Sequence, residues 1–377
     1  MKPRFSHSSL ISLILCSVSL APFGDTASAS LKDLKTPPGF RISVLTDQVP
    51  NARQMALSDS GILYVGSRRA GKIYAVPLSN AAGSPSRVVL VDSNLTMPSG
   101  IVMRGKDLYV GALNQILRYR NIDNHFSANP EPEIITDSLP NKTHHGWKYL
   151  SLGPDGNLYV PVGAPCNICL SENEEFASIL KVDPDTGKHS LYAQGVRNTV
   201  GLAWHPEKHT LWFSDNGRDR LGDDTPAEEL NEVTEPGQHF GYPFIHAGTI
   251  RDPKFGAGHD SKDYEPPRVK IQAHSAALGI TFYTADHFPK TYQGALFIAE
   301  HGSWNRSSKV GYQVSVVRFN NGRAIYEAFA SGWLKGQKSW GRPNDVLMTP
   351  QGELLVSDDQ SGTIFRISYE GNQGSSD

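Results

Sequence analysis

A short sequence motif recurs six times along this chain: an apolar strand, a turn with Asp-Gly or a similar pair, and a second strand of the Leu-Tyr-Val type. The copies cover residues 56–65, 100–110, 152–160, 201–213, 279–298 and 345–356. A hairpin repeated in this way cannot bury its apolar face alone, so neighbouring copies must stack on one another, and repeats of about 40 to 50 residues are typical of propeller blades. The sequence therefore predicts an all-β protein, a six-bladed β-propeller.

The repeat is interrupted once by a long insertion. The interval between the fourth and fifth copies is much longer than the others, and the extra residues fall within 215–273, which is rich in Gly, Pro, Asp, Glu and His. Loops of this length in a compact domain are usually functional or disordered. We expect these long loops to cap one face of the propeller.

The N-terminal segment has the features of a secretory signal peptide. Basic Lys2 and Arg4 precede an apolar core over 10–22, and the small residues at 27–29 resemble a cleavage site. The apolar core is too short for a confident membrane span. We therefore expect an exported protein, periplasmic or secreted, without stable membrane insertion, and the following division of the chain: a signal peptide over 1–29, a single propeller domain over 30–373 and a disordered tail over 374–377.

The charge balance argues against one class of partner. The chain has 36 Lys and Arg against 38 Asp and Glu, for a formal net charge of -2. Binding to nucleic acids or to anionic membranes is driven by a basic field, which this composition does not supply. We therefore expect no nucleic-acid partner.

Two cysteines remain beyond the expected cleavage site, Cys166 and Cys169. Export into an oxidising compartment favours a local disulfide between them that fixes a loop. A redox-active pair would need a helix N-terminus in an α/β unit, and a zinc site would need more ligands than the neighbouring sequence offers. We predict a structural Cys166–Cys169 disulfide.

Two adjacent histidines, His144 and His145, stand in the loop before the third copy of the motif. Loops at the ends of propeller strands converge on the axis, so polar groups there are candidates for a site. A histidine pair can supply a general base or a metal ligand, or it can be an ordinary solvated part of a loop. The residues alone leave these alternatives open.

Arg197 and Asn198 directly precede the apolar strand of the fourth copy. An arginine fork can bind an anion, and the neighbouring amide can add a directional hydrogen bond. The alternative is a structural arginine that bonds the carbonyl groups of loops.

Hard oxygen donors gather at 214–224 and 228–231, after the second strand of the fourth copy. Carboxylates and turn carbonyls are the ligands that calcium requires, although the spacing is not that of an EF-hand. The alternative here is an acidic, solvated loop.

Together these segments resemble the PQQ-dependent soluble sugar dehydrogenases, the family of quinoprotein glucose, aldose and sorbosone dehydrogenases. The likeness runs from about Pro37 to Tyr369. It rests on four motifs in the family's order: His-His-Gly-Trp-Lys at 144–148, Gly-Val-Arg-Asn at 195–198, Glu-Leu-Asn at 229–231 and Gly-Arg-Pro-Asn-Asp-Val at 341–346. The sorbosone dehydrogenase-like branch is suggested by the segments 164–167, 274–276 and 301–306.

The resemblance implies that PQQ lies flat on the axial face of a six-bladed propeller, with one calcium ion between the cofactor and the protein. It places the catalytic histidine on His145, with His144 as the adjacent alternative. It places the cofactor-binding pair on Arg197 and Asn198.

The resemblance also implies further contacts to the metal and the cofactor. Calcium-binding backbone carbonyls fall on Gly217 and Arg218, and an arginine near the cofactor carboxylates falls on Arg342. Ser99 stands where the glucose-oxidising branch has a larger amide, and Asn344 where that branch has a second arginine. Arg306 could serve in place of the family's lysine near the cofactor.

The implied reaction explains these residue types. Oxidation of a sugar hemiacetal or a hydrated aldehyde removes a hydroxyl proton as hydride leaves carbon, so a neutral histidine suits the role of base. Calcium acts as a Lewis acid, arginines neutralise the cofactor carboxylates, and the cofactor performs the redox step. The expected partners are a sugar or aldehyde substrate and a periplasmic electron acceptor such as a cytochrome or a quinone.

Two other functions are compatible with a propeller. A calcium-dependent sugar lactonase would also use an axial metal, but it needs carboxylate and amide side chains directly on the ion. A non-catalytic binding propeller would keep the scaffold without the reaction, since a fold does not determine a function.

Overall fold

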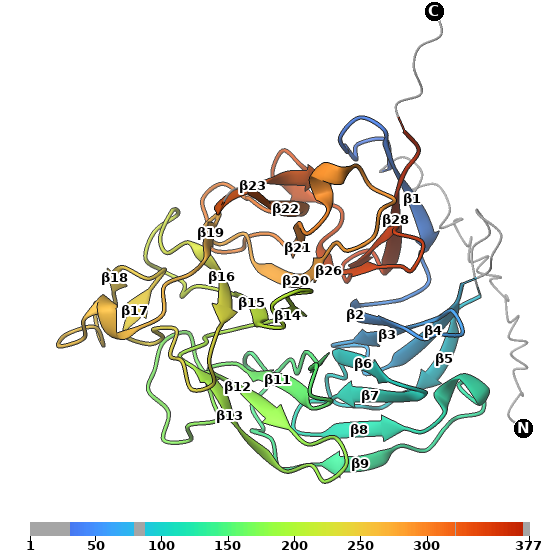
Figure 1. The fold of residues 1–377 in the computed structure, drawn as a ribbon, viewed down its shortest axis with the longest axis horizontal. Helices are drawn as coiled ribbons and strands as arrows, with labels where there is room; N and C mark the ends of the chain where they lie inside the picture. The colour runs from blue at the N-terminus through green and yellow to red at the C-terminus, as the bar shows by residue number, and fades with distance from the viewer. Residues whose placement is uncertain (1–30, 79–86, 321, 372–377) are drawn as a thin grey trace, which may run out of the picture.

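The computed structural model describes residues 31–78, 87–320 and 322–371. Six four-stranded antiparallel sheets surround a central axis (Figure 1), which confirms the all-β, six-bladed propeller. The expected signal peptide and the expected C-terminal tail lie outside the described residues. Within those residues, no helix has the length and apolar character needed to cross a membrane.

Each blade runs from an innermost strand at the axis to an outermost strand at the rim. The first three blades contain β2 (Ala52–Leu57), β3 (Ile62–Ser67), β4 (Ile73–Pro77) and β5 (Val89–Asp92); β6 (Gly100–Arg104), β7 (Asp107–Gly111), β8 (Ile116–Tyr119) and β9 (Glu133–Thr136); and β10 (Ser151–Leu152), β11 (Leu158–Val162), β12 (Ser178–Val182) and β13 (His189–Gln194). The other three contain β14 (Gly201–Trp204), β15 (Leu211–Asp215), β16 (Glu228–Val233) and β19 (Val269–Ile271); β20 (Ala277–Phe282), β21 (Leu296–Glu300), β22 (Gln313–Asn320) and β23 (Arg323–Ala330); and β26 (Pro343–Met348), β27 (Leu354–Asp358), β28 (Thr363–Tyr369) and β1 (Phe40–Thr46). The smaller elements are the hairpins β17 (Ile245–His246) with β18 (Ile250–Arg251) and β24 (Leu334–Lys335) with β25 (Lys338–Ser339), and the 3-10 helices η1 (Ile122–Asn124), η2 (Ser261–Asp263) and η3 (Lys290–Tyr292).

The repeated sequence motif corresponds to the hairpin formed by the innermost and second strands of every blade. All six copies fall on the first two strands of a blade, so the period that predicted the fold is the period of the blades. In the third blade the turn has Gly156 at a φ of 77°, a conformation that glycine adopts without steric cost. Asp155 closes the same turn by accepting a hydrogen bond from the backbone N–H of Asn157 at 3.1 Å.

The N-terminal strand closes the ring, a feature that the repeat did not reveal. β1 pairs antiparallel with β28 and becomes the outer strand of the last blade, with Phe40 opposite Tyr369 and Ile42 opposite Ile367. The ring of Phe40 packs against Phe288 and Phe329 at centroid distances of 4.7 and 5.0 Å. The last blade is therefore built from both ends of the chain.

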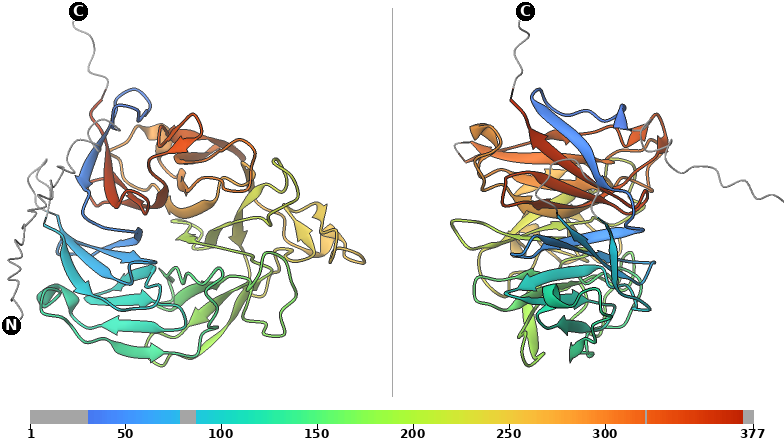
Figure 2. Two further views of the ribbon diagram at one scale, coloured as in Figure 1. Left: turned by 180° about the vertical axis from the view of Figure 1, so that it is seen from behind. Right: turned by 90° about the vertical axis from the view of Figure 1, so that its right-hand side faces the viewer.

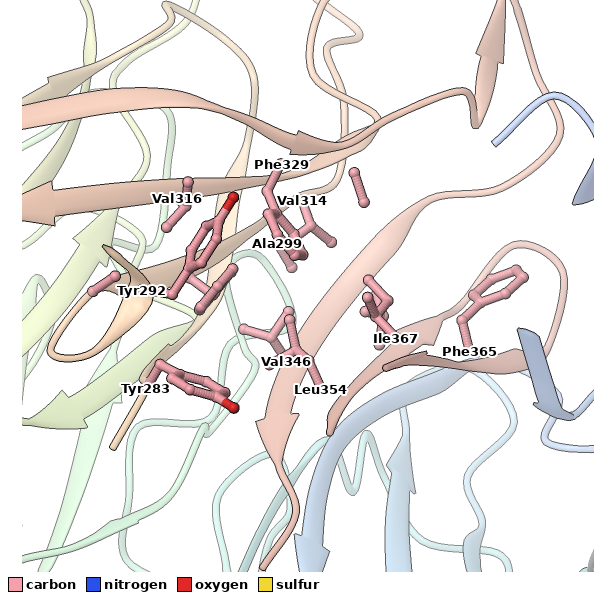
Figure 3. Packing of buried hydrophobic residues seen from close by; sticks show 14 of the residues in the cluster. Tyr283, Tyr292, Ala299, Val314, Val316, Phe329, Val346, Leu354, Phe365 and Ile367 are labelled. Atoms are coloured by element: carbon pink, nitrogen blue, oxygen red, sulfur yellow. The ribbon is translucent and has the colours of Figure 1, made fainter. Parts of the chain in front are cut away.

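Apolar side chains fill the space between neighbouring blades. Figure 3 shows one such cluster, in which Val314 and Phe329 of the fifth blade lie near Val346 and Ile367 of the sixth. Burial of this kind at every blade boundary supplies the main stabilisation of a propeller, because each blade shares its apolar faces with its neighbours.

The long insertion of 215–273 has two parts with different positions. Residues 216–227 join β15 to β16 and take part in the cleft described below. Residues 234–268 carry the β17–β18 hairpin, which lies at the outer rim in both Figure 1 and Figure 2 rather than over the axis. We therefore find a capping loop only in the first part of the insertion.

The axis itself is held by buried polar side chains that bridge blades. The amide oxygen of Gln54 on β2 accepts hydrogen bonds from the backbone N–H groups of Ile101 and Leu150, both at 2.9 Å, and its amide nitrogen donates to the carbonyl of Leu150 at 2.7 Å. Asp345 on β26 accepts from the N–H of Met55 at 2.8 Å and from the Tyr149 hydroxyl at 3.2 Å. These two side chains connect the first, second, third and sixth blades beside an axial channel of about 400 Å³.

Gln54→Leu should destabilise the propeller because it leaves two backbone N–H groups and one carbonyl buried without partners. Each such loss costs about 1–3 kcal/mol, so we expect the free energy of unfolding to fall by at least about 2 kcal/mol, measured by urea denaturation followed by tryptophan fluorescence. Gln48→Leu is the matched control, because Gln48 is exposed and its side chain makes no such bridge. Equal stability of the two variants would contradict the bridging role.

Candidate active site

One cleft brings together residues from several strand-end loops. Its volume is about 70 Å³, and it is lined by His145, Arg197, Asn198, Asn216, Gly217, Asp219, Glu228, His274, Ala276, Trp304 and Asn305. Four residues that the sequence nominated, His145, Arg197, Asn198 and Gly217, therefore share one site. A larger groove between the outer turns of the first and sixth blades contains none of the nominated residues.

His145 is held in one orientation by the end of β11. Its backbone is in the left-handed region, with a φ of 49°, and Gly163 makes room for it, since a Cβ at Gly163 would lie 2.5 Å from the Cβ of His145. The ring nitrogen Nδ1 lies 2.9 Å from the carbonyl oxygen of Ala164. Because a carbonyl only accepts, Nδ1 must carry the hydrogen, and Nε2 of the neutral ring keeps its lone pair.

The ring of His145 is neutral at ordinary pH. Burial, followed by the positive charge of Arg197, lowers the pKa of His145 to about 2. His144 is exposed, and its ring centroid lies 4.1 Å from that of His145. Burial is also the main cause that lowers the pKa of His144. The structure thus distinguishes an oriented, half-buried His145 from an exposed His144.

Arg197 and Asn198 are oriented by a buried carboxylate. Asp215, at the end of β15, accepts hydrogen bonds from the backbone N–H groups of Arg197 at 2.8 Å and Asn198 at 2.6 Å. The guanidinium of Arg197 donates to the carbonyls of Asn167 and Asn216, both at 2.9 Å. The side chain of Arg197 thus makes the loop contacts of a structural arginine while it lines the cleft.

Three of the carboxylates at 214–224 and 228–231 lie on strands, at the end of β15 and the start of β16. Asp215, Glu228 and Glu229 are all buried, and burial raises their pKa values to about 6, about 8 and about 7 respectively. Glu228 accepts hydrogen bonds from the backbone N–H groups of Gly217 and Ala276. The alternative of an acidic solvated loop is therefore wrong for these three residues, which orient the main chain.

The loop that contains Gly217 and Arg218 is fixed at several points. The guanidinium of Arg218 pairs with the buried Asp252 of the insertion, and Nε2 of His274 donates to the carbonyls of Gly222 at 2.9 Å and Thr225 at 3.1 Å. Among the described residues, no group of three or more His, Cys, Asp or Glu side chains is arranged to hold a metal ion. The calcium site implied by the resemblance would use backbone carbonyls of this loop as ligands, rather than His, Cys, Asp or Glu side chains.

A group of arginines is formed by Arg53, Arg68 and Arg342, in which the charge of Arg53 acts on the other two. Arg342 donates to the carbonyls of His301 at 2.9 Å and Gly302 at 2.6 Å. Arg53 pairs with Asp359 at 2.8 Å. Arg68 lies over the Trp147 ring at 4.0 Å. Burial first, and then the charge of Arg53, lowers the pKa of Arg68 to about 10.

Arg306 and Ser99 are among the nominated residues that lie outside the cleft. Arg306 is bound to the loop of the insertion through the carbonyl of Asp223 and the carboxylate of Asp224. Ser99 is buried, and its hydroxyl oxygen has no hydrogen-bond partner in the described protein. Neither residue lines the cleft that contains His145.

The predicted disulfide is confirmed, and it lies beside the cleft. Cys166 and Cys169 are bonded to each other, and the loop between them is anchored by Tyr242, whose hydroxyl accepts from the N–H of Cys169 at 3.0 Å. Asn167, inside this loop, contacts Arg197 directly.

The sequence did not nominate Asn167, Arg68 or Asp215 for the roles that they have here. The Cys-Asn-Ile-Cys spacing could have singled out Asn167, because a disulfide that fixes a short loop also fixes the side chains within it. Arg68 stands in an unremarkable loop of the first blade, and only its position against Trp147 makes it notable. Trp304 could have been found as an aromatic residue next to the nominated Arg306, and its indole is 68% exposed at the cleft.

Comparisons with known proteins agree with this architecture. The family model described as TrAA12-like matches residues 34–370. An uncharacterised protein of Borreliella burgdorferi is 31% identical over 388 residues, which cover 98% of this chain and 100% of that protein.

Two solved structures share the fold at low identity. The calcium structure of the Trichoderma reesei protein of carbohydrate-active enzyme family AA12 is 19% identical, covers 89% of this chain and 97% of its own, and has a TM-score of 0.77. The holo form of the PQQ domain of pyranose dehydrogenase from Coprinopsis cinerea is 18% identical, with coverage of 89% and 97% and a TM-score of 0.75.

The neutral state of His145 should appear in the pH dependence of stability. The unfolded chain binds a proton on this residue below about pH 6.5, but the folded protein does not do so until about pH 2, so stability falls as pH falls through this window. Each pH unit below the unfolded pKa contributes up to about 1.4 kcal/mol. Between pH 7.5 and pH 5, the free energy of unfolding should fall in both proteins. We expect the fall to be about 1–2 kcal/mol smaller in His145→Asn than in the wild type.

Asparagine is the suitable replacement because it tolerates a positive φ. His144→Asn is the matched control, and its pH dependence should differ less from that of the wild type because His144 is exposed. Urea denaturation at several pH values measures both. A slope unchanged by His145→Asn would show that the folded and unfolded states protonate His145 alike.

Proposed function

The chain belongs to the TrAA12-like family, and from this premise we propose that it is a PQQ-dependent dehydrogenase that oxidises a sugar hemiacetal or aldehyde, with calcium as second cofactor and His145 as base. The observation that carries the proposal is the orientation of His145, whose Nδ1–H is bound to Ala164 in a cleft that also contains Arg197 and Gly217. The sorbosone-like branch remains a prediction from the sequence.

The charges around the axis fit an anionic cofactor such as PQQ. Arg53, Arg68 and Arg342 lie close enough for Arg53 to lower the pKa of the other two. The carboxyl groups near them are Asp359, Asp358 and Asp345, and burial raises the pKa of Asp358 to about 6 and that of Asp345 to about 7, which favours their neutral forms. Positive charge therefore remains in excess, and a ligand that carries carboxylates would balance it. The buried amide nitrogen of Asn344, without a hydrogen-bond partner in the described protein, could donate to the same ligand.

The loop at Gly217 fits a calcium ion in the chemistry of its donors. Calcium binds oxygen ligands, including backbone carbonyls, and the carbonyl groups of Gly217 and Arg218 would supply them. Glu228 and Asp252 hold this loop through the N–H of Gly217 and the side chain of Arg218. The two residues would thus hold the ion indirectly, by fixing the main chain that carries its ligands.

Bound PQQ would supply the two-electron acceptor, and calcium beside it the Lewis acid. The remaining work falls to the protein. Nε2 of His145 is the atom that takes the hydroxyl proton of the sugar as its C–H bond breaks, because Nδ1 already donates to Ala164. The exposed indole of Trp304 provides an apolar surface at the same cleft, suited to the C–H face of a sugar ring.

We place the enzyme outside the cytoplasm, with a periplasmic cytochrome or quinone as its electron acceptor. The Cys166–Cys169 disulfide supports this location, since such bonds persist in oxidising compartments.

The first test of the proposal is reconstitution. Protein loaded with calcium and PQQ should reduce an artificial dye when supplied with an aldose or an aldehyde, and His145→Asn should lower kcat by at least about 100-fold, the usual contribution of a general base, while the PQQ dissociation constant changes little. His144→Asn should keep most of the activity. Dye reduction with a panel of donors and absorbance titration with PQQ measure these effects.

Other outcomes would identify the alternatives. Lactone hydrolysis without added PQQ would indicate a lactonase. Absence of both dye reduction and PQQ binding would contradict the enzyme proposal, and a function that survives His145→Asn would indicate a binding propeller.

The second test concerns the arginines. Arg68→Gln should raise the PQQ dissociation constant by about tenfold or more, since hydrogen bonds to charged groups contribute at least that much, and the loss should shrink at high salt. Arg69→Gln is the matched control, because the neighbouring Arg69 is exposed. Equal affinities of the two variants would exclude Arg68 from the cofactor site.

A further inference from the structure

We propose that Asn167, held by the disulfide on either side of it, is a positioning residue that fixes the Arg197 guanidinium and the loop at Asp219 for ligand binding. The role in ligand binding rests on the proposed function, whereas the contacts of Asn167 are present in the protein without a ligand. It assigns a role to the Cys166–Cys169 loop beyond stabilising the fold.

Asn167 makes four hydrogen bonds to two residues of the cleft. Its backbone carbonyl accepts from Nε of Arg197 at 2.9 Å, and its side-chain oxygen accepts from a terminal guanidinium nitrogen of Arg197 at 2.8 Å. The same side-chain oxygen accepts from the N–H of Asp219 at 2.9 Å, and the amide nitrogen donates to the carbonyl of Asp219 at 3.3 Å. One side chain thus connects the arginine to the loop that follows Gly217 and Arg218.

The disulfide restricts where Asn167 can lie. Cys166 and Cys169 close a loop of four residues around it, and Tyr242 anchors the far end through the N–H of Cys169. At the near end, the N–H of Ala164 donates to the carbonyl of Arg197 at 2.8 Å, and the carbonyl of Ala164 accepts from His145. A single segment of six residues therefore contacts the base, the arginine and the loop of the proposed metal ligands.

These contacts hold the guanidinium of Arg197 at the cleft. A long arginine side chain loses conformational entropy when it is fixed. The two hydrogen bonds from Arg197 to Asn167 offset this entropy loss in the ligand-free protein, before a ligand binds. Preorganisation of this kind raises affinity by reducing what binding itself must order.

The variants are Asn167→Ala, which removes all three side-chain hydrogen bonds, and Asn167→Asp, which keeps the acceptor oxygen for Arg197 and for the N–H of Asp219. Asn173→Ala is the matched control, because Asn173 is an exposed asparagine just beyond the loop and bonds only locally, to the N–H of Glu175. The first readout is hydrogen exchange of the segment 215–220 in ligand-free, calcium-free protein. Asn167→Ala should speed it by about tenfold or more, as expected for loss of a hydrogen-bonded restraint, and Asn173→Ala should not.

The second readout is the PQQ dissociation constant at saturating calcium. We expect it to rise by about tenfold or more in Asn167→Ala, the value of a hydrogen bond to a charged group, and to be largely restored in Asn167→Asp. The double change Cys166→Ser with Cys169→Ser should weaken binding in the same direction. Its effect should be smaller in an Asn167→Ala background, because the disulfide acts through Asn167.

The outcomes separate the two proposals. Unchanged exchange in Asn167→Ala overturns the positioning role, as does a lower melting temperature with unchanged PQQ affinity, which would indicate a purely structural residue. If Asn167→Ala does not fold, an unchanged PQQ affinity in the Cys166→Ser, Cys169→Ser double variant overturns it instead. Faster exchange in Asn167→Ala together with no PQQ binding by the wild type would support the positioning role and contradict only the proposed function.

Discussion

Buried hydrogen bonds between blades, close to the propeller axis, hold the blades from which the loops of the site extend. Gln54 and Asp345 join four blades, and the loops that form the cleft either precede an innermost strand or follow a second strand. Apolar packing between blades is strong but weakly directional. The buried amide of Gln54, which makes three hydrogen bonds, is satisfied in only one alignment of the neighbouring blades. The polar axis thus converts a ring of similar sheets into one arrangement with fixed loop positions.

Buried carboxylates and amides repeat this principle at the cleft. Asp215 orients the backbone of Arg197 and Asn198, and Glu228 orients Gly217. These acids are held in an environment that raises their pKa values, a cost that backbone N–H donors partly offset. The groups that face a ligand are therefore oriented by a layer of side chains that do not face it.

The sequence predicted the features that are local or periodic. The six hairpins could be found because each one repeats the same alternation and turn within a short stretch of chain, and the disulfide because its cysteines are only three positions apart. His145 and Arg197 could be nominated because they stand in motifs at strand ends. The role of Arg68 could not, since it depends on Trp147, a residue of another blade. The peripheral position of the β17–β18 hairpin was equally hidden, because loop length alone does not say in which direction a loop extends.

Closure of the ring by β1 has a consequence for the order in which the molecule can be completed. β1 is the first strand in the chain and its partner β28 the last of those described, so β1 has no strand to pair with until β28 has been made. Until then Phe40 has no ring of the last blade to pack against, and the exposed strand edge is a site for wrong pairing. The native ring therefore closes only after β28 has been made, and loss of β28 would remove the partner of β1 as well as a strand of the last blade.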